Sequence, residues 1–158
     1  MSKTILIPTD LTVESLNSVR IILEENNEPQ ISILLVCPVY LPDSIPELLY
    51  YNPQKAVDDL ISADFRDALF ILKNRFAKRL KELRIEVFHG LNGNAFESFV
   101  EANAVDEIVI PANYKLKKLK NGFDMLPFIR KSGNRVSNVE WAMSRNSDGS
   151  ALHRLFGV

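Results

Sequence analysis

The residues with the clearest chemical potential come directly after two apolar runs of the chain. The first run, at 5–7, ends at Pro8-Thr9-Asp10, and a later run ends at Pro111, two residues before Asn113. A carboxylate such as Asp10 could cap its own loop, or it could accept hydrogen bonds from a ribose hydroxyl or an adenine-side donor. Both interpretations stay open from the residues alone.

A lysine-rich segment, KLKKLK at 115–120, follows the later apolar run. Its ammonium groups could hold a ligand phosphate as point charges. A run of charges is more often a solvated face, and this one has no glycine to bring the backbone close to a phosphate. The segment therefore either binds a phosphate or forms a solvated turn, and the second interpretation is favoured.

Other residues that could form a metal, nucleotide or catalytic site do not have the spacing that such sites require. Two histidines, His89 and His153, and one cysteine, Cys37, give no metal-ligand pattern, so no metal site is predicted. We interpret His89 as a turn or capping residue and Cys37 as a buried, inert thiol. The sequence has neither the glycine pattern of dinucleotide-binding folds nor a P-loop, and no catalytic residue is assigned.

Hydrophobic periodicity predicts the elements that position these residues. Continuous apolar runs predict buried strands at 5–7, 31–36, 85–88 and 107–110. A more polar run at about 135–143 predicts an edge strand. Helices are expected after three suitable N-cap residues, Thr12, Asn94 and Asp124.

Two further segments complete the predicted order of elements. Apolar residues recur every three or four positions from about Lys55 to Leu83, which predicts one long amphipathic helix. Residues 38–54 hold four prolines and three tyrosines, which predicts an ordered loop or short helical excursion. The tyrosines either cover the end of the sheet or the long helix, which is the favoured interpretation, or form a binding lid or a surface for a protein partner.

Alternation of strands and helices predicts the α/β class, with an open, mostly parallel, five-stranded sheet and helices on both faces. Such sheets bind ligands past the carboxyl ends of the strands, at the point where the strand order reverses. The candidate ligand-binding residues at that edge are Pro8, Thr9, Asp10, Val36, Pro111 and Asn113.

Composition sets the class of protein. The chain has 158 residues, 46% of them hydrophobic, and a formal net charge of −1, which fits one globular domain and gives no electrostatic reason to expect nucleic acid or an anionic membrane. No apolar run is long enough for a signal-peptide core or a membrane span, so we expect a cytoplasmic protein. The predicted domain covers 1–146, and the tail at 147–158 could dock on this chain or on a partner.

Several segments together resemble the universal stress protein family over nearly the whole chain. The opening ILIPTDLTVESL, the strand ISILLVCPV, and HG followed by AFESFVEANAVDEIVI match that family in order and spacing. The resemblance implies an adenine nucleotide alpha-hydrolase-like, Rossmann-like three-layer sandwich. It also implies a homodimer that pairs through the last strand, here about Arg135 to Met143.

Family members that bind ATP have a Gly-x2-Gly-x9-Gly-(Ser/Thr) motif after the fourth strand. In this chain the corresponding positions hold Pro111, Tyr114 and Asp124-Met125, so none of the motif is present. The resemblance therefore implies a regulatory or interaction protein without enzymatic activity and without a bound cofactor. The alternative is an ATP- or AMP-binding protein, with slow hydrolysis retained as an option, in which the lysine-rich segment rebuilds the phosphate loop.

Overall fold

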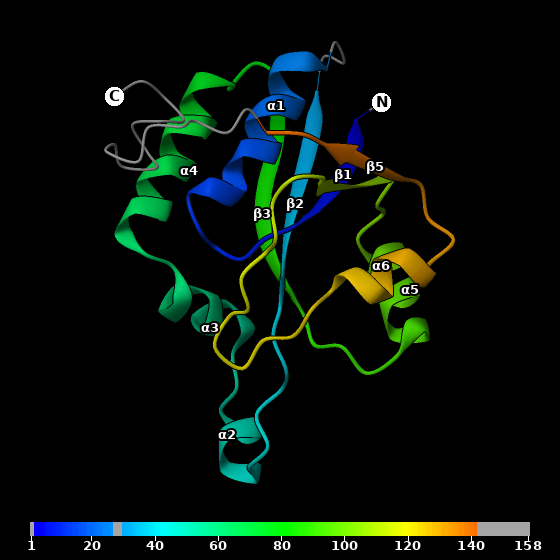
Figure 1. The fold of residues 1–158 in the computed structure, drawn as a ribbon. Helices are drawn as coiled ribbons and strands as arrows, with labels where there is room; N and C mark the ends of the chain where they lie inside the picture. The colour runs from blue at the N-terminus through cyan, green and yellow to red at the C-terminus, as the bar shows by residue number, and fades with distance from the viewer. Residues whose placement is uncertain (1, 27–29, 142–158) are drawn as a thin grey trace.

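A parallel β-sheet forms the centre of the structure, a computed structural model in which residues 2–26 and 30–141 are described (Figure 1). Its five strands have the order β3-β2-β1-β4-β5, and each pair of neighbours is parallel. The strands are β1 (Lys3–Pro8), β2 (Ile31–Pro38), β3 (Leu80–Phe88), β4 (Glu107–Pro111) and β5 (Val136–Val139). The predicted fold class is confirmed.

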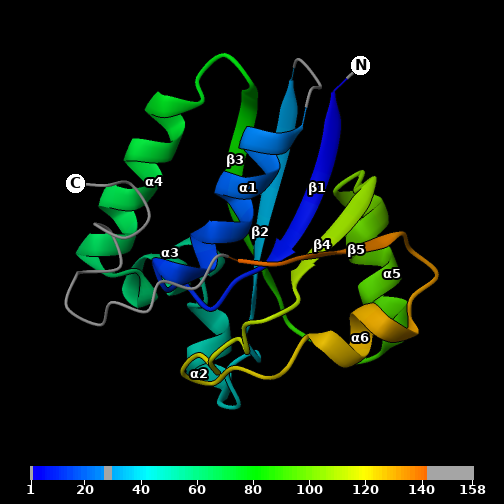
Figure 2. The ribbon, with the colours of Figure 1, turned by 45° about the horizontal axis from the view of Figure 1, so that its top comes forward.

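Helices cover both faces of the sheet (Figure 2). One face is covered by α1 (Asn17–Glu25), α3 (Pro53–Leu60) and α4 (Ala63–Arg75), and the other by α5 (Gly93–Ala102) and α6 (Leu126–Lys131). A short 3₁₀ turn, η1 (Glu14–Leu16), precedes α1, and the short helix α2 (Ile45–Leu49) projects from the sheet layers.

The core is divided into two layers because successive strand residues point to opposite faces. In β1, Ile5 and Ile7 pack with α1, α3 and α4, whereas Leu6 packs with α5 and α6. All eight residues of β2 are buried, as expected for a strand that is covered on both faces. This burial explains why the strand is a continuous apolar run in the sequence.

The prediction of one long helix from Lys55 to Leu83 is wrong. The segment forms two helices, α3 and α4, and then the first residues of strand β3. The break is at Ile61, whose ψ of 127° is extended, and at Ser62, whose hydroxyl accepts a hydrogen bond from Phe65 N at 3.1 Å. Ser62 is thus an N-cap residue, and the apolar spacing continued across the break without revealing it.

Three smaller differences concern where elements begin. Strand β3 starts at Leu80, earlier than predicted, because it pairs with β2 from Ile31 onward. Helix α5 is capped by Asn92, which accepts from Ala95 N, and not by Asn94. Thr12 closes the turn before α1 rather than capping α1 itself.

The fifth strand is an edge strand, as predicted, and among the described residues it spans Val136–Val139. The predicted continuation to Met143 and the tail at 147–158 lie outside the described residues. None of the described helices is long and apolar enough to cross a membrane.

Candidate functional site

The candidate residues gather at the carboxyl ends of β1 and β4. Strand β1 has β2 on one side and β4 on the other, so the strand order reverses here. Pro8 is the last residue of β1 and lies opposite Val36 of β2, and Pro111 is the last residue of β4. The structure therefore places these residues at the edge where ligands of parallel sheets bind.

Asp10 is the centre of this cluster, and its carboxylate is surrounded by donors from its own chain. It is only 5% exposed. One oxygen accepts from the backbone N–H of Thr12 at 3.2 Å and from the Thr12 hydroxyl at 2.5 Å. The other accepts from the Tyr114 hydroxyl at 2.8 Å and from the backbone N–H of Lys117 at 2.9 Å. These four hydrogen bonds fill the positions a ligand hydroxyl would need.

The polar groups of Thr9 also form hydrogen bonds within the chain. Its side-chain oxygen lies 2.9 Å from the Ser15 hydroxyl and accepts from Leu11 N at 3.0 Å, while its own N–H donates to Val36 O at 2.9 Å. Leu11 has a φ of 59°, in the left-handed region that a residue with a branched side chain rarely adopts. The Thr9 and Asp10 bonds hold the chain in this tight turn.

The loop after β4 folds back over the strand ends. The Asn113 side-chain amide donates to Trp141 O at 2.7 Å and its carbonyl accepts from Trp141 N at 2.9 Å. The Tyr114 ring lies on the Trp141 ring, with centroids 4.3 Å apart, and the indole N–H donates to Ser18 Oγ at 2.9 Å. Tyr114 and Trp141 therefore fill the space beside Asp10.

The lysine-rich segment contributes backbone rather than charge to this cluster. All four of its lysine side chains, at 115, 117, 118 and 120, are exposed, whereas Leu116 and Leu119 are half-buried. Lys117 reaches Asp10 only through its backbone N–H. The segment is thus a solvated face with Leu119 packed against the core, in line with the favoured interpretation.

A tight turn at Gly122 joins the end of the lysine-rich segment to the chain that leaves β2. Phe123 N donates to Pro38 O and Tyr40 N donates to Asn121 O, and the Tyr40 and Phe123 rings lie 4.6 Å apart. A Cβ atom at Gly122 would lie 2.8 Å from Leu119 O and 2.9 Å from Pro38 O. Glycine is therefore required at this contact.

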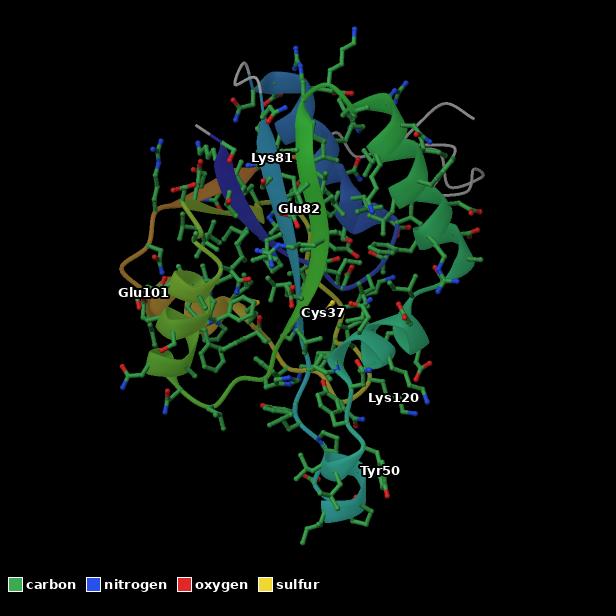
Figure 3. All side chains as sticks on the ribbon, turned by 180° about the vertical axis from the view of Figure 1, so that it is seen from behind. Cys37, Tyr50, Lys81, Glu82, Glu101 and Lys120 are labelled. Atoms are coloured by element: carbon green, nitrogen blue, oxygen red, sulfur yellow. The ribbon has the colours of Figure 1, made fainter. Side chains whose placement is uncertain are left out.

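Burial sets the electrostatics around Asp10. It raises the pKa of the Tyr114 hydroxyl well above its ordinary value. The Thr12 hydroxyl, 3.3 Å from the Tyr114 hydroxyl, lowers that pKa in part, and the bond to Asp10 and the charge of Asp10 raise it further. Burial, with the Asp10 charge, also raises the pKa of the Cys37 thiol to about 12. Cys37 lies within the sheet (Figure 3) and is buried and protonated, as predicted for an inert thiol.

His89 lies apart from Asp10, at the end of β3. Its Nδ1 is 3.0 Å from Val39 O, and because a carbonyl only accepts, Nδ1 carries the proton and donates. The ring also packs edge-on against Tyr51, with centroids 5.4 Å apart. These contacts agree with the turn or capping role that the sequence indicates. Within the described residues, no group of side chains could hold a metal ion.

The cluster includes residues that the sequence did not single out as site residues, above all Ser18 and Trp141. Trp141 lies more than a hundred positions from Ser18 in the chain, and it follows β5, which pairs alongside β4 in the same sheet. The chain's single tryptophan, within the strand predicted at about 135–143, was the available signal. It did not identify the residues that the ring would contact.

Several solved structures share this architecture. A universal stress protein, UspA from Lactobacillus plantarum, has a TM-score of 0.54 at 15% identity, over 87% of this chain and 97% of that one. The hypothetical proteins PH0823 and MJ0577 each have a TM-score of 0.50 at 18% identity, over 90% of this chain and 99% and 98% of theirs. No protein-family model and no curated protein sequence matches the chain.

The class that these comparisons define is an α/β protein with a five-stranded parallel sheet of the Rossmann-like kind. Within that class, the chain has the universal stress protein fold, which is the fold implied by its sequence resemblance. At these identities the likeness concerns the fold, so the function must be argued from the site.

Proposed function

We propose that this chain is a universal stress protein-like regulatory or interaction domain that does not use the usual ATP phosphate loop. The observation that carries the proposal is the state of the Asp10 carboxylate, which is bonded by Thr12, Tyr114 and Lys117 of its own chain. A ribose would have to displace Tyr114 to reach it. The displacement would break charge-assisted hydrogen bonds that a ligand must then replace.

The positions that correspond to the ATP-binding motif of the family support the same conclusion. At the positions of the motif glycines, Pro111 has no N–H to offer and Tyr114 is bonded to Asp10. At the position of the last glycine, Asp124 accepts a hydrogen bond from Leu126 N at 3.0 Å at the start of α6, and Met125 is buried. A carboxylate here would repel a phosphate.

Thermal unfolding with ATP-Mg, AMP and cyclic AMP, each at millimolar concentration, tests the proposal. A ligand at a hundred times its Kd stabilises the native state by about 2.7 kcal/mol, which raises the Tm of a domain of this size by several degrees. We expect no such shift. A rise with ATP-Mg that Asp10→Ala abolishes would favour the alternative, an ATP- or AMP-binding protein with a lysine-rich phosphate loop.

A substitution at Tyr114 tests whether the chain has a nucleotide site that is blocked by its own side chains or has no such site. Tyr114→Ala removes both the hydroxyl bonded to Asp10 and the ring stacked on Trp141. If the closed cluster alone prevents nucleotide binding, this variant gains a Tm shift with AMP that the parent lacks. Tyr50→Ala, which removes a ring that is 87% exposed and lies outside the cluster, is the matched control and should gain none.

The lack of enzymatic activity is part of the same proposal. It is supported by the bonded state of Asp10 and by the role of His89, whose Nδ1–H is donated to Val39 O. Release of inorganic phosphate from ATP-Mg should match that of a buffer blank. Turnover that is lost in Asp10→Ala would contradict this part of the proposal.

We further propose that the protein is a cytoplasmic homodimer that pairs through β5. In support, the carbonyls of Arg135 and Val139 accept hydrogen bonds from β4, so the backbone groups of Asn138 between them face away from the sheet. Asn138→Pro removes the outward N–H and should yield a monomer in sedimentation equilibrium, whereas Asn134→Ala, before the strand, should not. A parent that sediments as a monomer would refute the dimer.

A further inference from the structure

The segment between β2 and α3 carries most of the large apolar side chains that are exposed in the described residues. Ile45, Leu49 and Tyr50 are 73%, 75% and 87% exposed, and Tyr40, Leu41 and Leu48 add to the same surface. Helix α2 buries none of its residues and projects from the body of the molecule (Figures 1 and 3). Apolar side chains grouped in this way mark an interaction surface more often than chance exposure does.

A groove of about 860 Å³ lies beside this surface, between α2, α3 and the loop after β3. We call it the α2 groove; its lining includes Leu41, Asp43, Glu47, Leu48, Asp59 and Leu91. It is separate from the Asp10 cluster, none of whose side chains line it. Its volume is in the range of sites that hold a ligand or a few side chains of a partner.

The charge of the groove restricts its partner. Residues 40–60 contain four acidic side chains, Asp43, Glu47, Asp58 and Asp59, against one basic side chain, Lys55. Across the groove, Lys120 is the only lysine or arginine among the lining residues. An acidic rim disfavours nucleic acid and anionic lipid and attracts a basic segment.

The groove is held open by fixed contacts at its base. Tyr40 N donates to Asn121 O, and the Tyr40 ring stacks on Phe123. A preformed site loses less conformational freedom when it binds than a loop that must become ordered. The base of the groove is therefore preformed.

We propose that the α2 groove binds a short helical segment of another protein, with apolar residues on one face and lysines or arginines beside them. Leu41, Leu48 and Leu91 would contact the apolar face, and Asp43, Glu47 and Asp59 the basic residues. The inference rests on the proposed function, because it names the kind of partner that an interaction domain of this fold would recognise.

A labelled synthetic peptide of leucine and lysine, with leucines at i, i+3, i+4 and i+7, is the probe, and fluorescence anisotropy at low salt measures its Kd. A peptide with glutamate in place of lysine and a scrambled peptide are the ligand controls. We expect the parent protein to bind the first peptide at least tenfold more tightly than either control.

Charge-reversal variants locate the binding site. Asp43→Lys with Glu47→Lys should weaken binding about tenfold at low salt. The matched variant, Asp67→Lys with Glu101→Lys, changes the net charge equally on exposed residues of α4 and α5 and should stay within twofold of the parent. An equal loss in both variants would overturn the proposal, since attraction would then be to overall charge. Far-UV circular dichroism confirms that both variants fold.

An apolar variant and a measurement of size complete the test. Leu48→Ala with Leu49→Ala removes exposed side chains of α2 and should weaken peptide binding at least fivefold, whereas Phe70→Ala, on the exposed face of α4, should not. Unchanged binding would overturn the proposal. Self-association that Leu48→Ala with Leu49→Ala abolishes and Asn138→Pro preserves would overturn it too, because the occupant would be a second copy, whose lysine-rich segment has the same chemistry.

The outcomes of the nucleotide experiment and of the peptide-binding experiment are independent of each other. A Tm rise with ATP-Mg would refute the proposed function through the Asp10 cluster, whatever the peptide result. Absence of peptide binding with no nucleotide shift would refute the α2 groove as a peptide site and leave the proposed function standing.

Discussion

At the scale of single residues, Tyr114 holds the Asp10 cluster together. Its hydroxyl donates to Asp10 and its ring lies on Trp141. Tyr114→Phe keeps the ring and removes the hydrogen bond to a charged acceptor, so we expect a loss of about 1–2 kcal/mol in the free energy of unfolding. Urea denaturation measures it. Tyr40→Phe, at an exposed ring, is the control and should change stability by less than about 0.5 kcal/mol.

Cys37 gives a second prediction at this scale. Because its thiol is buried and has a pKa of about 12, it is protonated and inaccessible at pH 8. Reaction with a thiol reagent in native buffer should therefore be far slower than in denaturant. A native rate close to that of free cysteine would contradict the burial of β2 described above.

The positions of the candidate residues could be predicted from the sequence, but their bonding could not. Pro8, Thr9 and Asp10 end an apolar run, and the carboxyl ends of parallel strands meet at one edge, which is enough to place them. The choice between a capping role and a ligand role for Asp10 depended on Tyr114 and Lys117, about a hundred residues away. Sequence spacing contains no information on which distant donor fills the second carboxylate oxygen.

At the scale of elements, the division between α3 and α4 depends on a single cap. Ser62 accepts from Phe65 N, and α4 buries Phe65, Ala68 and Leu72 in the core. Ser62→Ala should cost about 1 kcal/mol of the free energy of unfolding, within the range for N-cap loss. Urea denaturation provides the measurement.

Ser44→Ala is the matched control for this prediction. Ser44 caps α2 in the same way, but α2 buries no residue and can lose its first turn without exposing the core. Its removal should leave the free energy of unfolding nearly unchanged. Equal effects of the two substitutions would contradict the different packing of α2 and α4.

Elements were predicted well where a strand or helix has one uninterrupted pattern. The runs at 31–36 and 107–110 were recognised as strands because burial on both faces makes them continuously apolar. Failure came at 55–83, where α3, α4 and the start of β3 follow each other and all place apolar residues toward the same layer. The regular apolar spacing reflects that shared layer, so the spacing continued across the break at Ser62.

At the scale of the whole molecule, Glu107 connects three strands. It lies in β4, 2.6 Å from Lys3 Nζ of β1, and accepts from Ser137 Oγ of β5 at 2.5 Å. Burial alone would raise the pKa of Glu107, but the bonds from Lys3 and Ser137 and the charges of Lys3 and Arg135 lower it below its ordinary value of 4.5. The ionised carboxylate is therefore the form that stabilises the fold.

A lowered pKa in the folded state sets the direction of the pH dependence. The contribution of Glu107 is complete at pH values above 4.5 and is lost as the pH falls through its lower, folded-state value. Urea midpoints between pH 7 and pH 3 should therefore fall more steeply for the parent than for Glu107→Gln. Glu101→Gln, an exposed residue of α5, should follow the parent curve.

The position of Trp141 has a spectroscopic consequence. As the chain's single tryptophan, 4% exposed and in contact with Tyr114, it is an intrinsic fluorophore located at the strand ends. Its emission should be blue-shifted in the native protein and should move to the red only when the Asp10 cluster opens. Fluorescence and far-UV circular dichroism, followed in one urea titration, would therefore separate local opening of this cluster from unfolding of the helices.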